Sequence, residues 1–423
     1  MRNFFLILFI ATNLCGQRIS SSKISRIINR NSVFSKAQVS IAIQPLGSNK
    51  KIKGVQSSKY MTPASNTKLL TFLGAIQTFD SIPVINYSIK NNELHVSSTG
   101  YPFLFHPIYS DQSFEKFLNS YEKIVYHDPD LTLSRFGPGW AWDDYPFYFS
   151  AETNIFPLFG NVARFTKSDK NNILVHPDNF KILIDSLFNN KIIRNEINNT
   201  FIVNPIRFEH NDTIYIPFKT SKKLTLELLN QNLSSEVEIS LDKLQSYNVL
   251  YSKDPSKIYS AILKSSDNLV AESLLLMIGK ELNDDFSPIK TINSLKRKWK
   301  SWTPDPLIWY DGSGLSRYSM VTPRTLVAVL QKIYTQIDIE GIKKYFAAGG
   351  KSGTIKNYYK KAETPFVYAK TGTLRNNHNL SGYIVSKKGN WYVFSIMVNH
   401  FESPTNQIRL AIVDILEYLY KRG

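Results

Sequence analysis

The pattern of apolar and polar positions is clearest near the end of the chain, where short apolar segments typical of strands precede a segment with helical spacing. It predicts three successive antiparallel strands and then an amphipathic helix, at residues 366–369, 380–386, 391–399 and 407–420. Near the beginning, polar and apolar residues alternate over residues 38–43 as in a strand, and residues 51–55 can pair with them across the Gly47-Ser48-Asn49 turn. These elements predict an antiparallel sheet covered by a helix.

A second set of segments has the apolar spacing of helices. These predicted helices cover residues 65–77, 258–264, 269–282 and 323–334. Pro63 fixes where the first helix begins, because proline inside a helix removes a backbone donor and clashes with the preceding turn. Pro323 suits the first turn of the last helix.

The middle of the chain is a patchwork of short strand-like and helix-like runs without an internal repeat. It follows a predicted hairpin of residues 84–90 and 93–97. We therefore predict an α/β (α+β) sandwich made from both chain ends, interrupted by an inserted, mostly β domain. The predicted segments are 18–97 and 251–423 for the discontinuous domain and 98–250 for the insert.

Composition and charge narrow the class of protein. With 423 residues the chain is long enough for two or three domains, each with its own core. A hydrophobic content of 43% and a charged content of 20% are those of a folded globular protein. The net charge of +17 suits a solvated surface, and also peripheral attraction to an anionic membrane or wall polymer. No recognised nucleic-acid-binding motif occurs, so we predict no nucleic-acid partner.

The first residues have the pattern of a secretory signal peptide. A basic start at residues 1–3 precedes an apolar run at 4–11, which is too short for a stable membrane span. We predict that residues 1–17 are removed and that a soluble mature protein is exported to the periplasm or cell envelope. In a second interpretation Cys15, the only cysteine, carries a lipid anchor, but the bulky Leu14 before it disfavours this. No later segment has the apolar length needed to cross a bilayer.

Ser65 and Lys68 form the first candidate catalytic pair. They are three positions apart at a predicted helix start, so both side chains lie on one face. A serine hydroxyl becomes a good nucleophile only when a base removes its proton, and an amine does so only in its neutral form. Burial and a second cation, for which Lys370 is the candidate, both favour that form. The helix N-terminus also offers backbone N–H groups to a developing oxyanion.

The string Ser266-Asp267-Asn268 lies in a short gap between two predicted helices, where a loop can aim side chains into a cleft. Ser266 can relay a proton between Lys68 and a departing amine. Asn268 can hydrogen-bond a backbone group of a substrate. All three residue types of this string also serve as helix N-caps, and both roles can hold at once.

The third string, Lys370-Thr371-Gly372, follows a predicted strand. An edge strand can pair with an extended peptide, and Gly372 lets that backbone come close. We expect Lys370 and Thr371 to hold a carboxylate, and the backbone N–H of Thr373 to complete the oxyanion site. A similar string at residues 351–354 has a loop context, so we assign the role to Lys370.

Each string alone has an ordinary structural explanation, but the three in this order indicate an active-site serine acyltransferase. The sequence motifs of other enzyme classes are absent. Gly312-Ser313-Gly314 is not the five-residue elbow of hydrolases, and the seven histidines include no zinc-peptidase string. No cysteine cluster for zinc and no phosphate-binding glycine loop occur, so we predict neither a metal nor an organic cofactor. Composition alone leaves a histidine-based triad open.

The sequence resembles the D-alanyl-D-alanine carboxypeptidase/endopeptidase family, the class C low-molecular-mass penicillin-binding proteins, over most of the mature chain. The segments that carry the resemblance are 63–68, 139–144, 266–272, 311–317 with 321–323, and 370–374 with 380–383. The resemblance implies a penicilloyl-serine transferase (β-lactamase/transpeptidase-like) fold with domains inserted between the first two strings. It also implies that Asp144, Phe149 and Arg317 line a subsite for a diamino acid, where Asp144 meets an ammonium and Arg317 a carboxylate. Beyond about residue 165 the insert departs from the family pattern.

The activity implied by the resemblance is that of a serine-type D-Ala-D-Ala carboxypeptidase, which hydrolyses the terminal D-alanine of peptidoglycan stem peptides through an acyl-Ser65 intermediate. The predicted catalytic residues are Ser65, Lys68, Ser266, Asn268 and Lys370, and β-lactam antibiotics are the expected acylating inhibitors. DD-endopeptidase cleavage of cross-links uses the same chemistry and stays open. A β-lactamase, which seldom has so large an insert, and an inactive wall-binding module, which does not need the intact strings, are less favoured. The third stem-peptide residue, the role of the insert and the oligomeric state stay open.

Overall fold

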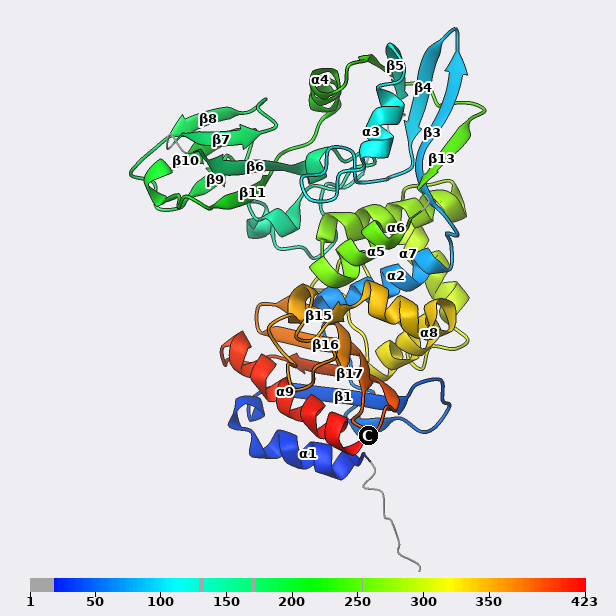
Figure 1. Ribbon diagram of the computed structural model, residues 1–423, viewed down its shortest axis with the longest axis vertical. Coiled ribbons are helices and arrows are strands. Elements are labelled where there is room, and N and C mark those ends of the chain that lie inside the picture. The colour runs from blue at the N-terminus through cyan, green and yellow to red at the C-terminus, as the bar shows by residue number, and fades with distance from the viewer. Residues whose placement is uncertain (1–18, 129–132, 169–171, 253) are drawn as a thin grey trace, which may run out of the picture.

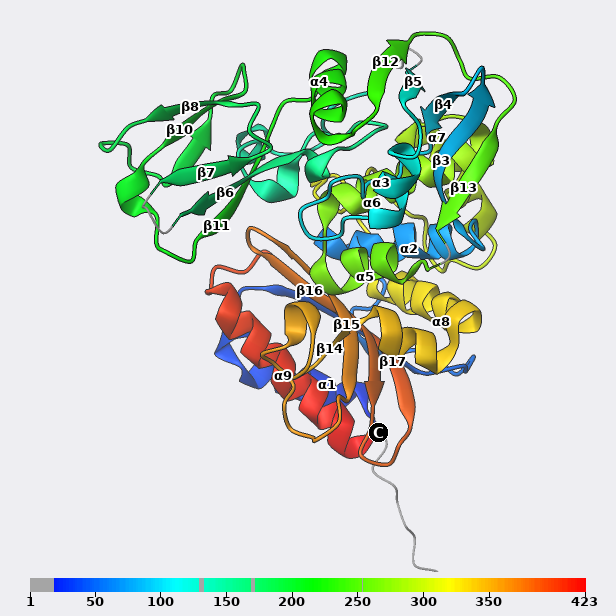
Figure 2. The ribbon, with the colours of Figure 1, turned by 45° about the horizontal axis from the view of Figure 1, so that its top comes forward.

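The computed structural model describes residues 19–128, 133–168, 172–252 and 254–423. The predicted signal peptide and Cys15 lie outside these residues. Figures 1 and 2 show a sheet with helices on both faces, and a region of smaller sheets beyond the helical layer. Within the described ranges, no helix combines the length and the apolar character that crossing a bilayer requires.

The helices and strands are numbered in chain order. The helices are α1 (Ser21–Arg30), α2 (Lys68–Ile76), α3 (Gln112–Leu118), α4 (Lys222–Asn232), α5 (Ser256–Ser260), α6 (Asn268–Asn283), α7 (Pro288–Trp299), α8 (Pro323–Tyr345) and α9 (Thr405–Arg422). The strands are β1 (Gln38–Pro45), β2 (Lys53–Val55), β3 (Ile82–Lys90), β4 (Glu93–Ser98), β5 (Lys123–His127), β6 (Val162–Lys167), β7 (Ile173–His176), β8 (Lys181–Ile184), β9 (Ile192–Arg194), β10 (Thr200–Val203), β11 (Thr213–Pro217), β12 (Glu236–Ser240), β13 (Asn248–Ser252), β14 (Ala347–Ala348), β15 (Val367–Leu374), β16 (Asn377–Val385) and β17 (Trp391–Asn399).

The main sheet joins both ends of the chain. Its strand order is β14-β15-β16-β17-β1-β2, and each neighbouring pair is antiparallel. β1 pairs with β17 from Gln38 opposite Asn399 to Pro45 opposite Tyr392. Strands β16 and β17 are buried almost throughout, because α1 and α9 cover one face and α8 packs on the other (Figure 1). The predicted terminal strands, their antiparallel order and the covering helix are confirmed.

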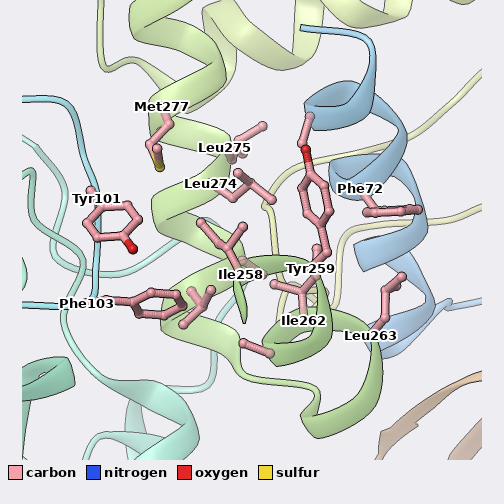
Figure 3. Close-up of a cluster of buried hydrophobic side chains, with 14 of the residues drawn as sticks. Phe72, Tyr101, Phe103, Ile258, Tyr259, Ile262, Leu263, Leu274, Leu275 and Met277 are labelled. Carbon is pink, nitrogen blue, oxygen red and sulfur yellow. The ribbon is translucent and has the colours of Figure 1, made fainter. Parts of the chain in front are cut away.

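A helical core fixes α2 against α5 and α6. Figure 3 shows Phe72 of α2 against Tyr259 of α5, with ring centroids 5.1 Å apart in an edge-to-face arrangement. Leu274 and Leu275 of α6 complete this part of the core. Each such side chain contributes about 1.5–3 kcal/mol when fully buried. Since α2 follows Ser65 and α6 follows Ser266, this packing sets the relative positions of the first two strings.

Two predicted helices differ from the structure. The predicted helix 258–264 is the short α5 followed by a π-helical turn, Ala261–Ser265, which ends at Ser266 in the left-handed region with φ 63°. The turn shifts the register by one residue just before the second string, as π-turns commonly do near functional sites. Helix α8 continues past residue 334 to Tyr345, through a break at Asp338.

The inserted region is rich in strands, as predicted. Its largest sheet has the order β12-β5-β4-β3-β13, in which β12, β5 and β4 run parallel. The predicted hairpin is confirmed as β3 and β4, and Asn91 and Asn92 at its turn both have positive φ. Two three-stranded sheets, β11-β6-β7 and β8-β10-β9, lie farther out (Figure 2).

The predicted domain boundaries fall inside strands of the largest insert sheet. β4 crosses the boundary between residues 97 and 98, and β13 crosses the boundary between residues 250 and 251. Because β3, β4 and β13 pair within one sheet with β5 and β12, we propose boundaries before β3 and after β13.

Candidate active site

The first string places a serine next to a buried amine. Ser65 lies in a 3-10 turn, Ala64–Thr67, that leads into α2. Lys68 Nζ donates hydrogen bonds to Ser65 Oγ at 3.1 Å, to the Ser313 carbonyl at 2.8 Å and to Asn268 Oδ1 at 2.5 Å. The Lys68 side chain has no exposed surface, so these three oxygens hold the amine in one position.

Burial changes the acid–base character of both lysines. It lowers the pKa of Lys68 from 10.5 to about 8, although the carboxylates of Glu272, Asp311 and Asp267 act in the opposite direction. Burial, followed by the charge of Lys68, holds the pKa of Lys370 well below its usual value. A useful fraction of Lys68 is therefore neutral near neutral pH and able to accept a proton.

The second string divides its roles among its residues. Lys370 Nζ donates a hydrogen bond to Ser266 Oγ at 2.8 Å. Asp267 caps α6 by accepting the Val270 N–H at 3.0 Å. The capping role therefore belongs to Asp267, whereas Ser266 and Asn268 contact the two lysines. The Asn268 side chain accepts from Lys68 and donates from Nδ2 to the Phe149 carbonyl at 2.8 Å, which fixes its orientation.

The third string lies on β15, against the turn that holds Ser65. A Cβ at Gly372 would lie 2.4 Å from the Pro63 carbonyl oxygen and 3.1 Å from the Ser65 nitrogen. Only glycine allows this approach, and it brings the β15 backbone beside the backbone N–H of Ser65. Thr373 Oγ1 is hydrogen-bonded to His378 Nδ1 at 2.7 Å, and burial lowers the pKa of His378 to about 3, so this imidazole is neutral.

The string at residues 351–354 lies in a loop, as predicted. One of its residues, Thr354, nevertheless contacts the third string. Thr354, in a 3-10 turn, has its Oγ1 within 2.8 Å of Thr371 Oγ1, with Thr371 as donor. Sequence reasoning missed this contact because it treated the two strings as competitors for one role. A repeated Lys-x-Gly-Thr-like pattern was the available signal.

A cavity of about 570 Å³ brings most of the predicted site residues together. Its lining includes Ser65, Asp144, Phe149, Ser266, Asn268, Arg317, Thr371 and Thr373. Lys68 and Lys370 are buried beneath it, and Gly372 lies at the contact with the Ser65 turn. The lining also contains Arg375 and Arg409, which the sequence analysis did not single out.

The cavity carries charges of both signs. Burial and the neighbouring Asp143 raise the pKa of Asp144, while the positive charge of Arg317 acts against this rise. Arg375 and Arg409 add positive charge to the lining. The arrangement suits a ligand that has both an ammonium and carboxylates.

Two buried carboxyl groups hold the loop behind Lys68. Glu272 accepts the backbone N–H groups of Gly312 at 2.9 Å and Ser313 at 2.7 Å, and the Ser313 carbonyl then accepts from Lys68. Asp311 accepts the Gly314 N–H and the Trp140 Nε1–H, each at 2.9 Å. Burial and the charge of Asp311 raise the pKa of Glu272 to about 7. The sequence indicated these residues only through their segments' resemblance to a family.

Metal-ligating side chains do not gather in the described part of the chain. Among residues 19–128, 133–168, 172–252 and 254–423, no group of three or more His, Cys, Asp or Glu side chains is arranged to hold a metal ion.

Comparison with known proteins agrees with this arrangement. The sequence profile of the D-Ala-D-Ala carboxypeptidase 3 (S13) family matches residues 20–93 and 218–419. The chain belongs to this family. The resemblance inferred from the sequence is confirmed at this level, and the matched ranges contain all three strings.

Two relatives of this S13 chain are both named as carboxypeptidases. D-alanyl-D-alanine carboxypeptidase DacB of Haemophilus influenzae is 27% identical over 160 residues, which cover 36% of this chain and 33% of the relative. Penicillin-sensitive carboxypeptidase A of Dictyostelium discoideum is 27% identical over 179 residues, which cover 40% of this chain and 34% of the relative. The chain thus matches about a third of the length of each.

Solved structures share the fold over nearly the whole chain. Penicillin binding protein 4 (dacB) from H. influenzae superposes with a TM-score of 0.74 at 20% identity, covering 95% of this chain and 100% of that one. The Bd0816 predatory endopeptidase from Bdellovibrio bacteriovorus gives a TM-score of 0.53 at 15% identity, covering 90% and 93%. The predicted fold class, an α/β sandwich with an inserted strand-rich region, is confirmed by the likeness to the penicillin binding protein 4 structure.

Proposed function

We propose that this S13-family protein is a serine-type D-Ala-D-Ala carboxypeptidase that removes the terminal D-alanine from peptidoglycan stem peptides. The observation that carries the proposal is the buried Lys68 amine, 3.1 Å from Ser65 Oγ at the base of an open cavity. Family membership supports the reaction class.

The acylation step uses the first string and the β15 backbone. Neutral Lys68 accepts the Ser65 proton as Oγ attacks the carbonyl carbon of the penultimate D-alanine. The carbonyl π electrons move to oxygen, and the backbone N–H groups of Ser65 and Thr373 stabilise the resulting oxyanion. The close approach of β15 at Gly372 supports this pairing of donors.

Collapse of the tetrahedral intermediate releases D-alanine. The carbonyl re-forms, the C–N bond breaks, and the leaving nitrogen takes a proton from Ser266 Oγ. The Lys68 ammonium returns its proton to Ser266 Oγ, which the hydrogen bond from Lys370 holds in place. Water then attacks the carbonyl carbon of the Ser65 ester and gives a proton to Lys68. The bond between this carbon and Ser65 Oγ breaks, and Oγ takes the proton back from Lys68, which restores the free enzyme.

Substrate recognition follows from the charges of the cavity. Thr371, supported by Thr354, and the nearby arginines 375 and 409 suit the terminal carboxylate of the peptide. Asp144 and Arg317, which also line the cavity, suit the ammonium and carboxylate of a diamino acid side chain. Asn268, fixed between Lys68 and the Phe149 carbonyl, has one N–H left for the peptide backbone.

The same geometry serves DD-endopeptidase cleavage, because only the leaving amine differs. The Bdellovibrio protein with this fold is described as an endopeptidase, which keeps cross-linked peptides as a second candidate substrate. Inhibition by β-lactams is part of the proposal, since a related penicillin binding protein 4 was solved with a β-lactam.

Two measurements test the proposal. Labelled penicillin should acylate the purified protein at Ser65, with the adduct located by mass spectrometry, and Ser65→Ala should abolish labelling. Ser58→Ala, at an exposed serine nearby in the chain, is the matched control and should label normally. A peptide ending in D-Ala-D-Ala should release D-alanine. Failure of the wild-type protein to label or to release D-alanine would refute the carboxypeptidase.

Digestion of cross-linked peptidoglycan separates the two substrates. Loss of terminal D-alanine from uncross-linked stems identifies the carboxypeptidase, and conversion of cross-linked dimers to monomers identifies the endopeptidase.

Export also remains a proposal, which rests on the signal-like residues 1–17. Sequencing the N-terminus of the protein recovered from the cell envelope tests it.

A further inference from the structure

A second cavity, of about 770 Å³, adjoins the active-site cavity. Tyr148, Ser265 and Asn268 line both cavities, so they form the ridge between them. The other walls of this second cavity, here called the side groove, are the loop at residues 106–109 and strands β9 and β11 of the inserted region. The groove therefore lies where the insert meets the start of α6.

The side groove presents apolar and aromatic side chains to solvent. Ile108, Phe147 and Tyr148 are 60%, 52% and 65% exposed. The Phe147 ring is stacked on Phe149, with centroids 5.4 Å apart and an interplanar angle of 7°, so it is held in place without a ligand. Exposed flat rings beside a catalytic cavity indicate a surface that a ligand covers.

One buried polar group of the groove has an unused donor. His106 Nδ1 accepts the backbone N–H groups of Ile108 at 3.2 Å and Tyr109 at 3.3 Å. The neutral imidazole therefore carries its proton on Nε2. His106 is only 5% exposed, yet it lines the groove, and its Nε2–H, which has no hydrogen-bond partner among the described residues, is free to donate to water or to a ligand. A ligand acceptor would satisfy this donor.

Lys191 and Asp267 are the charged groups that line the groove, and Lys191 is already in an ion pair. Lys191 forms an ion pair with Asp212 at 2.7 Å, and Asp267 accepts the Val270 N–H that begins α6. A second stem peptide would bring carboxylates to a surface whose lysine is already paired, which carries a desolvation cost. An N-acetylated amino sugar is neutral, has apolar C–H faces that stack on aromatic rings, and has acetamido and hydroxyl acceptors.

We propose that the side groove binds a neutral N-acetylated amino sugar of the glycan strand, the one that bears the stem peptide being cleaved. This inference rests on the proposed function. About four extended residues separate the scissile bond from that sugar and span up to about 14 Å, so the sugar can reach an adjoining cavity. The protein would thus recognise its substrate by both sugar and peptide.

The test compares one pentapeptide with and without its disaccharide. The wild-type protein should hydrolyse the disaccharide pentapeptide with a lower KM than the free pentapeptide. Phe147→Ala and Ile108→Ala should each raise the KM for the disaccharide substrate by about three- to tenfold, the size of a lost aromatic or apolar contact. For Ile108→Ala, which lies away from the active-site cavity lining, KM and kcat for the free pentapeptide and the rate of penicillin labelling should stay within about twofold of wild type.

Matched controls lie outside the groove. Ile197→Ala, at an exposed isoleucine of the insert, and Tyr247→Ala, at an exposed aromatic residue, should leave the preference for the disaccharide substrate intact. Equal KM values for the two wild-type substrates, or a preference that survives both groove substitutions, would overturn the sugar assignment while leaving the carboxypeptidase in place. A preference for sugar-free cross-linked dimers that the groove substitutions remove would assign the groove to a second stem peptide instead. Failure to release D-alanine from either pentapeptide refutes the proposed function itself.

Discussion

The pKa of Lys68 makes the pH dependence of acylation a direct test of the catalytic base. An ordinary lysine with a pKa of 10.5 is neutral in about one molecule in 3000 at pH 7, whereas a pKa of about 8 makes about one in ten neutral. Burial therefore increases the reactive form of Lys68 about 300-fold at pH 7. Because the neutral amine is the base, the acylation rate should follow this fraction.

The assay is the second-order rate constant for acylation by labelled penicillin between about pH 6 and about pH 9.5. We expect the constant to rise nearly tenfold per pH unit below the pKa of Lys68, about 8, and to level off above it. Unfolding curves at each pH show whether the fold is intact. A flat profile between about pH 6 and about pH 8, or a rise centred near 10.5, would contradict the assignment of Lys68 as base.

Glu272 titrates in the same window and must be separated from Lys68. Burial raises the pKa of its carboxyl to about 7, and its negative charge raises the pKa of Lys68. Glu272→Gln removes that charge, so the midpoint of the Lys68 profile should move to lower pH. A midpoint that moves to higher pH, in a variant that unfolds like wild type, would contradict the electrostatic reasoning.

Three further substitutions test the geometry of the site. Gly372→Ala places a Cβ 2.4 Å from the Pro63 carbonyl oxygen, so penicillin labelling should fall at least about a hundredfold; near-normal labelling would contradict the close approach. Thr354→Val removes the hydroxyl that accepts from Thr371, and kcat/KM for a D-Ala-D-Ala peptide should fall about three- to tenfold in a steady-state assay. Trp140→Phe removes the indole donor to Asp311, and denaturant titration should show a free energy of unfolding lower by about 1.5–3 kcal/mol; an unchanged value would mean that solvent replaces the bond.

Local patterns predicted the parts of the fold whose partners are close in sequence. The hairpin β3–β4 and the apolar strands β15 to β17 are joined by short connections, so their pairing follows from the sequence. The parallel pairs of the insert were not predictable in this way. Leu94 lies opposite Ile124, and Lys123 lies opposite Glu236, so their pairing depends on long connections that leave no local signal.

In the candidate site, too, spacing along the chain predicted only the contacts between residues close in sequence. The three-residue spacing of Ser65 and Lys68 predicts their contact, because a single helical turn sets it. Arg409 reaches the cavity from α9, whose pattern indicated only a helix that covers the sheet. Thr354 reaches it from a loop. Their positions depend on how the C-terminal elements close around β15, which spacing along the chain does not encode.

The pairing of the first strand with the last has a consequence for biosynthesis. β1 leaves the ribosome early, but its neighbour β17 ends at Asn399, close to the end of the chain. Until that partner is made, one edge of β1 lacks its main neighbour, and closing so long a loop is slow. A nascent or truncated polypeptide therefore has no assembled nucleophile, and reactivity toward penicillin should switch on only after translation is nearly complete.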